Sequence, residues 1–187
     1  YQVCAKEQEE QKTSYQAQQS QLFDRLDSLK NKQARAQSLE NILRNHSNFY
    51  AGVKSVLQEK YLLGGIIGAV SEHLTFDVRY QTALEIALGA SSQHIIVEDE
   101  ESATRAIDFL KRNRAGRATF LPLTTIKART ISSQNQDAIA SSPGFLGMAD
   151  ELVTFDTRLE SIFKNLLATT AIFDTVEHAR AEARQVR

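Results

Sequence analysis

The fold is decided by the stretch GGIIGAVSEHLTFD, residues Gly64 to Asp77, because its second half returns later in the chain. From Gly68 the chain reads GAVSEHLTFDVRYQ, and from Gly147 it reads GMADELVTFDTRLE. The offset is 79, and six of the fourteen aligned positions are identical. A spaced match of this kind indicates a duplicated structural unit. The identical pairs are Gly68/Gly147, Glu72/Glu151, Thr75/Thr154, Phe76/Phe155, Asp77/Asp156 and Arg79/Arg158.

The first unit alternates short apolar runs with amphipathic segments. Strands are expected at residues 66–70, 94–97 and 117–123. Between them, one helix is expected to start at Phe76 and Asp77 and to stop at Gly89. A second helix follows the acidic residues 98–101, which suit a helix N-terminus, and ends before Gly116. This alternation predicts an α/β (α+β) fold, in which strands form a sheet and helices pack on it.

The second unit repeats this order but lacks the last strand. Residues 145–149, 156–167, 170–173 and 176–185 match the first strand, first helix, second strand and second helix. The offset falls to 76 at the second strand, so three residues are missing before it. By the same offset the last strand would begin beyond Arg187, so we expect an unpaired sheet edge that another chain could extend. Residues 127–143 are polar and contain a Ser-Ser-Pro-Gly turn, which predicts a linker with little core of its own.

Residues 4–50 predict one long helix, because they contain neither Gly nor Pro. Leu22, Leu26 and Leu29 keep heptad spacing, and the phase shifts between Ala36 and Leu39. A helix with so narrow a stripe of apolar residues needs a partner helix to be stable, either from outside this segment or from another chain. A free solvated helix is the alternative. A short helix is expected over residues 53–60. The domain assignment is therefore a coiled-coil arm (1–50), subdomain I (51–126), a linker (127–143) and subdomain II (144–187).

Composition restricts the classes of protein further. Cys4 is the only cysteine, so no intrachain disulfide can form. No apolar run is long enough to cross a bilayer, and no signal peptide is visible. The chain begins at Tyr1 within a helical pattern, which suggests a segment excised from a longer protein. The net charge is −1, yet residues 102–131 carry seven basic side chains and one acidic side chain.

Motifs for catalysis are absent from the sequence, and we expect neither enzymatic activity nor a cofactor. No GxxxxGK[ST] pattern occurs, and the glycines at 64, 65 and 68 are better explained by close packing than by phosphate binding. The four histidines lack metal-ligand spacing. The repeated acids are either an acid–base set or helix-capping groups, and capping is favoured. They are Glu72, Glu151, Asp77 and Asp156.

The basic run at residues 111–117 is the best candidate for function. Its density of positive charge suits contact with a DNA or RNA backbone. Capping of the preceding helix and solubility explain the same residues equally well. The run consists of Lys111, Arg112, Arg114 and Arg117, with Lys127 and Arg129 following.

From YAGVKSVL onward, through GAVSEH, ALGA, IIVEDE and GRATFLPL, the chain closely resembles the hinge domain of SMC (structural maintenance of chromosomes) proteins, in particular bacterial ones. The resemblance covers residues 49–187, with the arm helix before them. It implies two similar subdomains, homodimerisation through the hinge, arms that lead to ATPase heads, condensin-type partner subunits and non-specific contact with DNA. It further implies a cytoplasmic, nucleoid-associated protein without a membrane partner.

The resemblance also implies site residues. The glycines of the first repeat and their twin in the second would lie at or near the dimer interface, namely Gly64, Gly65, Gly68 and Gly147. DNA would be contacted near the arm junction by Lys54 and Lys60 and by Lys111, Arg112, Arg114 and Arg117. In the family, subdomain II continues into a last strand and a glycine-rich motif that this sequence does not contain.

Two other functions fit the same sequence. A duplicated α/β domain could bind a small ligand between its units and use the coiled coil to oligomerise. A coiled-coil scaffold is the third possibility. The SMC hinge module, which dimerises a chromosome-organising ATPase and contacts DNA, is the function that we expect.

Overall fold

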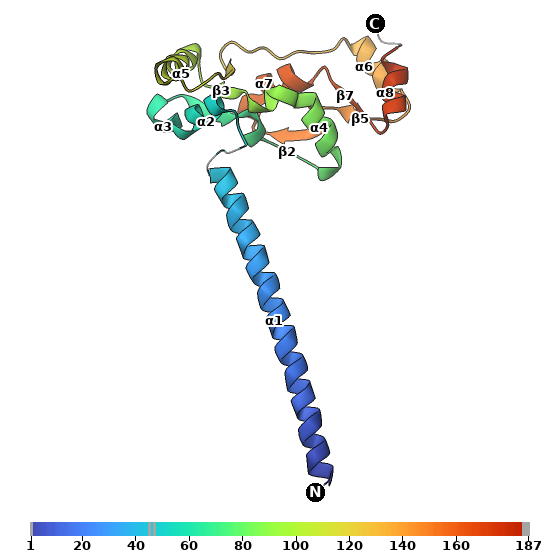
Figure 1. Ribbon diagram of the computed structural model, residues 1–187. Helices are drawn as coiled ribbons and strands as arrows, with labels where there is room; N and C mark the ends of the chain where they lie inside the picture. The colour runs from blue at the N-terminus through green and yellow to red at the C-terminus, as the bar shows by residue number, and fades with distance from the viewer. Residues whose placement is uncertain (1, 45, 47, 185–187) are drawn as a thin grey trace. The chain divides into compact units, whose positions relative to one another are not determined.

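The computed structural model describes residues 2–44, 46 and 48–184, and it divides into two units, Tyr1–Asn48 and Phe49–Arg187. The first unit is the helix α1, Gln2–Arg44 (Figure 1). Its heptad side chains Leu22, Leu26 and Leu29 are exposed. The predicted helix over residues 4–50 was too long at its C-terminal end, because the chain leaves the helix after Arg44 and His46 adopts a positive φ of 47°.

Subdomain I is built on a three-stranded sheet in the order β1-β3-β4. Its strands are β1 (Ile66–Ala69), β3 (Ile95–Val97) and β4 (Phe120–Pro122). Strand β3 is antiparallel to β1 and parallel to β4. The helices α2 (Ala51–Gln58), α3 (Lys60–Leu63) and α5 (Glu100–Asn113) belong to this subdomain. All three predicted strands are thus confirmed; β3 is buried throughout, whereas β1 and β4 are partly buried.

Subdomain II repeats the β1–β3 pair. Strand β5 (Phe145–Met148) is antiparallel to β7 (Ala171–Phe173), and α8 (Val176–Glu182) follows. Gly68 pairs with Ile96, and Gly147 pairs with Ile172, with a register shift at the same place in both ladders. Within residues 48–184, β7 pairs only with β5, so one edge of this strand is free.

The sequence missed two strands, β2 (Leu74–Phe76) and β6 (Val153–Phe155). They pair with each other, and Thr75 lies opposite Thr154, its own repeat counterpart. A pseudo-two-fold axis therefore passes between these threonines and relates the two subdomains. The helices predicted at Phe76 and Asp156 begin later, after the 3₁₀ turns η2 (Val78–Tyr80) and η4 (Thr157–Leu159). They are α4 (Gln81–Leu88) and α7 (Glu160–Leu167).

The linker has more structure than its polar sequence predicted. After a turn at residues 123–125, residues 126–132 lack regular secondary structure and lead to α6 (Ser133–Ala140) (Figure 1). This segment, residues 126–132, is called the strap below. Helix α6 buries Ile139 and packs against β5, as α2 packs against β1. The linker thus contains the first helix of the second repeat, and one apolar side chain holds it in place.

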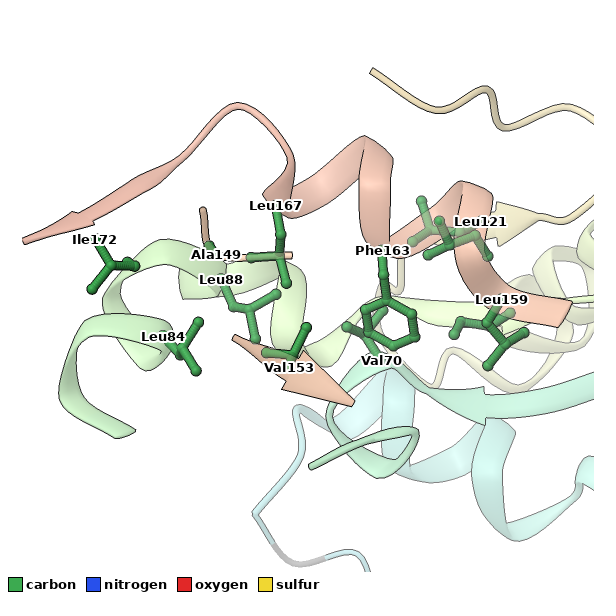
Figure 2. Close-up of a cluster of buried hydrophobic side chains, with 12 residues drawn as sticks. Val70, Leu84, Leu88, Leu121, Ala149, Val153, Leu159, Phe163, Leu167 and Ile172 are labelled. Atoms are coloured by element: carbon green, nitrogen blue, oxygen red, sulfur yellow. The ribbon is translucent and has the colours of Figure 1, made fainter. Parts of the chain in front are cut away.

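One hydrophobic cluster joins the two subdomains. Leu84 and Leu88 of α4 gather in one cluster with Val153 of β6 and with Phe163 and Leu167 of α7 (Figure 2). A second cluster lies within subdomain I, beneath α2 and α5. Most buried residues of subdomain II belong to the shared cluster, although Met148 of β5 and Ile139 of α6 do not. The stability of subdomain II therefore depends largely on subdomain I.

Candidate functional surfaces

The basic run surrounds the C-terminal end of α5. Asp99 caps the start of this helix by accepting a hydrogen bond from the Ser102 amide at 2.7 Å. At the other end Arg114 adopts the left-handed conformation, with φ 49° and ψ 38°, so an arginine closes the helix before Gly116 is reached. All four basic side chains of the run are exposed, and only Lys111 has a nearby acid, Asp108 at 3.9 Å, among the described residues.

The loop that follows α5 lies against the start of α2. A Cβ on Gly52 would be 2.3 Å from the carbonyl oxygen of Arg117, so only glycine fits there. Tyr50, Val53 and Arg117 line a depression of about 310 Å³ at this contact. The fold therefore brings Arg117 to the part of the second unit that follows the arm helix in the chain.

The side chains of Lys54 and Lys60 are less exposed than those of the basic run at the end of α5. Both are half-buried. The Lys60 ammonium lies 5.2 Å from the centroid of the neighbouring Tyr61 ring, which is a cation–π contact. The DNA role of all six basic residues stays a prediction.

Gly65 holds a positive φ of 69° at the entry to β1. A Cβ there would lie 2.0 Å from Oγ of Ser102, and its carbonyl oxygen accepts the Glu98 amide at 2.9 Å. Arg105 donates to the carbonyl of Leu63 at 3.1 Å and to Oγ of Ser102 at 2.8 Å. The glycine turn is thus fixed to the first turn of α5.

Gly68 and Gly147 also face their own subdomains. A Cβ on Gly68 would be 2.4 Å from Nε2 of His73, and one on Gly147 would be 3.0 Å from Cδ2 of Leu152. His73 and Leu152 are repeat counterparts. Gly64 differs, because its Cβ would meet no atom within 4 Å. Intramolecular packing thus explains three of these four glycines, and a role in a dimer interface stays a prediction.

Sequence reasoning missed Gly144, Ser102 and Arg105. Gly144 lies 79 residues after Gly65 and has a φ of 76°. Its carbonyl accepts the Asp174 amide at 2.9 Å, as Gly65 accepts that of Glu98. The offset of 79 could have identified Gly144, whereas the contacts of Ser102 and Arg105 depend on the tertiary fold.

The repeated carboxylates are capping groups. Asp77 and Asp156 each accept the amide of the arginine two residues later at 2.9 Å. Hydrogen bonds from those arginine side chains, Arg79 and Arg158, hold the pKa of both carboxyls below the usual range. Glu72 accepts the Ala69 amide at 2.9 Å, and Glu151 accepts the Met148 amide at 3.4 Å. The capping interpretation is therefore confirmed for both repeats.

The histidines do not form a site together. Among the described residues, no group of three or more His, Cys, Asp or Glu side chains is arranged to hold a metal ion. His73 and His94 each bury one ring nitrogen that has no hydrogen-bond partner, and burial lowers the pKa of His94. His178 lies 2.7 Å from Asp174, and this hydrogen bond lowers the pKa of Asp174. No helix within the described ranges is long and apolar enough to cross a membrane.

Comparisons with known proteins agree on one family. The model described as "SMC proteins Flexible Hinge Domain" matches residues 63–183. The Chromosome partition protein Smc of Bacillus subtilis (strain 168) is 43% identical over 176 residues, which cover 94% of this chain and 15% of that protein. Its counterpart in Lactiplantibacillus plantarum is 41% identical over 170 residues, 91% of this chain and 14% of that protein. The chain thus spans a small part of these relatives.

Solved structures give the same result. The asymmetric dimer of the Geobacillus stearothermophilus SMC hinge domain matches with a TM-score of 0.81 at 42% identity, over 83% of this chain and 62% of that chain. The Pyrococcus furiosus Smc hinge domain with an extended coiled coil matches with a TM-score of 0.59 at 29% identity, over 81% and 50%. The predicted α/β fold, in which a long helix precedes two similar subdomains in the chain, is therefore confirmed.

Proposed function

The chain belongs to the flexible hinge domain family of SMC proteins, and from this membership we propose that it is the dimerisation module of a chromosome partition protein. The observation that carries the proposal is the match to a hinge domain whose structure was solved as a dimer. The parent protein would use ATPase heads outside this segment, would work with condensin-type subunits and would reside at the nucleoid.

Dimerisation is tested on the parent protein at its full natural length. We expect light scattering to give the mass of a dimer. Replacing residues 49–184 with a short flexible linker, while both arms are kept, should give a monomer. A dimer that survives this replacement would place the dimerisation site elsewhere and overturn the proposal.

The second part of the proposal is that the basic end of α5 contacts DNA. Lys111, Arg112 and Arg114 are exposed and have little acidic compensation, and Arg117 lies where the second unit begins. Positive charge of this density attracts the phosphate backbone without reading bases. Binding should therefore be independent of sequence and sensitive to salt.

Charge neutralisation tests this contact. The variant Lys111→Gln/Arg112→Gln/Arg114→Gln should bind all duplexes more weakly by a similar factor. Its salt dependence should also be flatter, by about 0.9 in log–log slope for each lost phosphate contact. The matched control is Lys30→Gln/Lys32→Gln/Arg35→Gln on α1, which removes the same charge from exposed positions. Equal loss in both variants would indicate a general charge effect, and no loss in the α5 variant in low salt would remove this surface from the proposal.

A further inference from the structure

Subdomain II contains a crevice of about 360 Å³ that has no assigned role. Helix α7 and the turn after β5 form two of its walls, and the strap closes a third. Asn165 ties the strap down by donating from Nδ2 to the carbonyl of Lys127 at 2.7 Å. The charged lining residues of the crevice are Arg129, Asp150, Glu151 and Lys164, and Met148, Phe155 and Ala168 are apolar ones.

The crevice exists because the second repeat is three residues shorter than the first. In subdomain I, α4 continues into the 3₁₀ helix η3 (Gly89–Gln93), which packs against η1 (Val70–Glu72). Ala168 is the counterpart of Gly89, and only Thr169 separates it from the next matched strand. Residues equivalent to both η1 and the start of η3 therefore line the crevice, and the segment that would fill it is missing.

The floor of the crevice is apolar. Met148 is 3% exposed. Phe155 stacks on Phe163 of the shared core with ring centroids 4.6 Å apart. These two side chains offer an apolar contact to the apolar part of a ligand.

The walls carry opposite charges. Asp150 is half-buried, and burial raises the pKa of its carboxyl. It forms no ion pair among the residues that the structure describes, and neither does Arg129 on the strap. Lys164 is paired with Glu160 at 2.6 Å, so its charge is already partly satisfied. Glu151 also lines the crevice, and its carboxylate accepts the Met148 amide at 3.4 Å. With Lys164 in an ion pair and Glu151 on a backbone amide, Asp150 and Arg129 are the anion and the cation left for a ligand.

We propose that this crevice binds a small zwitterion of the amino-acid type, with its carboxylate at Arg129, its ammonium group at Asp150 and its side chain against Met148 and Phe155. The volume lies at the lower end of the range of about 300–1,000 Å³ for small-ligand sites. A ligand with one charge would leave the opposite wall group desolvated and unpaired, which costs affinity. A zwitterion satisfies both groups at once.

The test is calorimetric titration of the chain with L-phenylalanine, whose ring suits the Met148–Phe155 floor. Phenethylamine lacks the carboxylate and hydrocinnamate lacks the ammonium group, so each should bind at least about tenfold more weakly, since a charged hydrogen bond contributes about 1.4 kcal/mol or more. Absence of binding by L-phenylalanine at about 10 mM overturns the proposal. Equal binding by either one-charge analogue overturns it as well.

Variants locate the site. Arg129→Gln and Asp150→Asn should each weaken L-phenylalanine binding about tenfold, whereas Lys127→Gln, on the strap but outside the crevice, should not. A third variant inserts Ser-Ser-Gln, the sequence of residues 91–93, after Ala168 to restore the length of the first repeat. It should abolish binding while a thermal melt shows that it is folded. Binding that survives all three changes contradicts the proposal and leaves dimerisation and DNA contact untouched.

Discussion

At the scale of single residues, each repeat depends on a glycine with positive φ at the entry to its first strand. Gly65 approaches Ser102, and Gly144 approaches Asp174 and His178. In both places the glycine carbonyl accepts the amide of the residue that follows the second matched strand. A left-handed residue therefore joins the strand pair to the first turn of the next helix, and this explains why glycine occurs there twice.

Substitutions of the adjacent glycines Gly64 and Gly65 can be compared directly. Both have a positive φ, but only Gly65 has a neighbour within reach of a Cβ, Ser102 at 2.0 Å. Gly64→Ala should reduce the free energy of unfolding by about 1–2 kcal/mol, for backbone strain alone. Gly65→Ala should cost about 2–5 kcal/mol, because overpacking adds to the strain. Urea denaturation measures both, and equal losses would contradict the contact with Ser102.

At the scale of elements, the sequence predicted the strands whose signal is local and missed those whose stability comes from distant pairing. The strands β1, β3, β5 and β7 are apolar runs that can be recognised by themselves. In contrast, β2 and β6 have three residues each, and Thr75 finds its partner only at Thr154. Ile139 is the one buried residue of helix α6, so the amphipathic pattern of this helix was too weak to detect.

In the candidate site, too, the sequence predicted the local features and missed those that depend on distant contacts. The basic run was visible in the sequence because charge density is a local property. Its position against Gly52 and α2 was not, since that contact joins residues far apart in the chain. The change of offset from 79 to 76 showed that three residues are missing from the second repeat, but it predicted neither the crevice nor the strap that covers it.

The cap of α5 predicts a pH dependence for this element. The amide of Ser102, and then its hydroxyl, donate to Asp99 and lower the pKa of this carboxyl in the folded state. Stability from a lowered pKa is present above the unfolded value of 3.8 and is lost as the pH falls through the folded pKa. Asp99→Asn keeps an acceptor oxygen but no charge, so it should be less stable than the parent at pH 7.

The measurement is the urea midpoint of both proteins at pH 7 and at about pH 3. Protonation removes the charge of Asp99 in the parent, so the gap between the two midpoints should narrow in acid. A gap that stays constant or widens would show that the charge on Asp99 does not stabilise the helix.

At the scale of the whole second unit, the pseudo-two-fold axis and the shared core make the two subdomains one folding unit. The β2–β6 ladder lies on this axis, and the cluster in Figure 2 takes side chains from both α4 and α7. Subdomain I has its own second cluster beneath α5, whereas most buried residues of subdomain II belong to the shared cluster. A substitution that destabilises the shared core should therefore destabilise both subdomains.

Phe163→Ala tests this coupling, because Phe163 is 0% exposed and belongs to subdomain II. We expect a loss of about 3–5 kcal/mol, against less than about 0.5 kcal/mol for the control Val78→Ala at an exposed position. Hydrogen exchange of the Ile95 amide, which donates to the Thr119 carbonyl at 2.9 Å in subdomain I, should accelerate together with that of the Ala149 amide, which donates to Thr170 at 2.8 Å in subdomain II. If Ile95 kept its protection while Ala149 lost it, the two subdomains would unfold independently, and the shared core would not couple them.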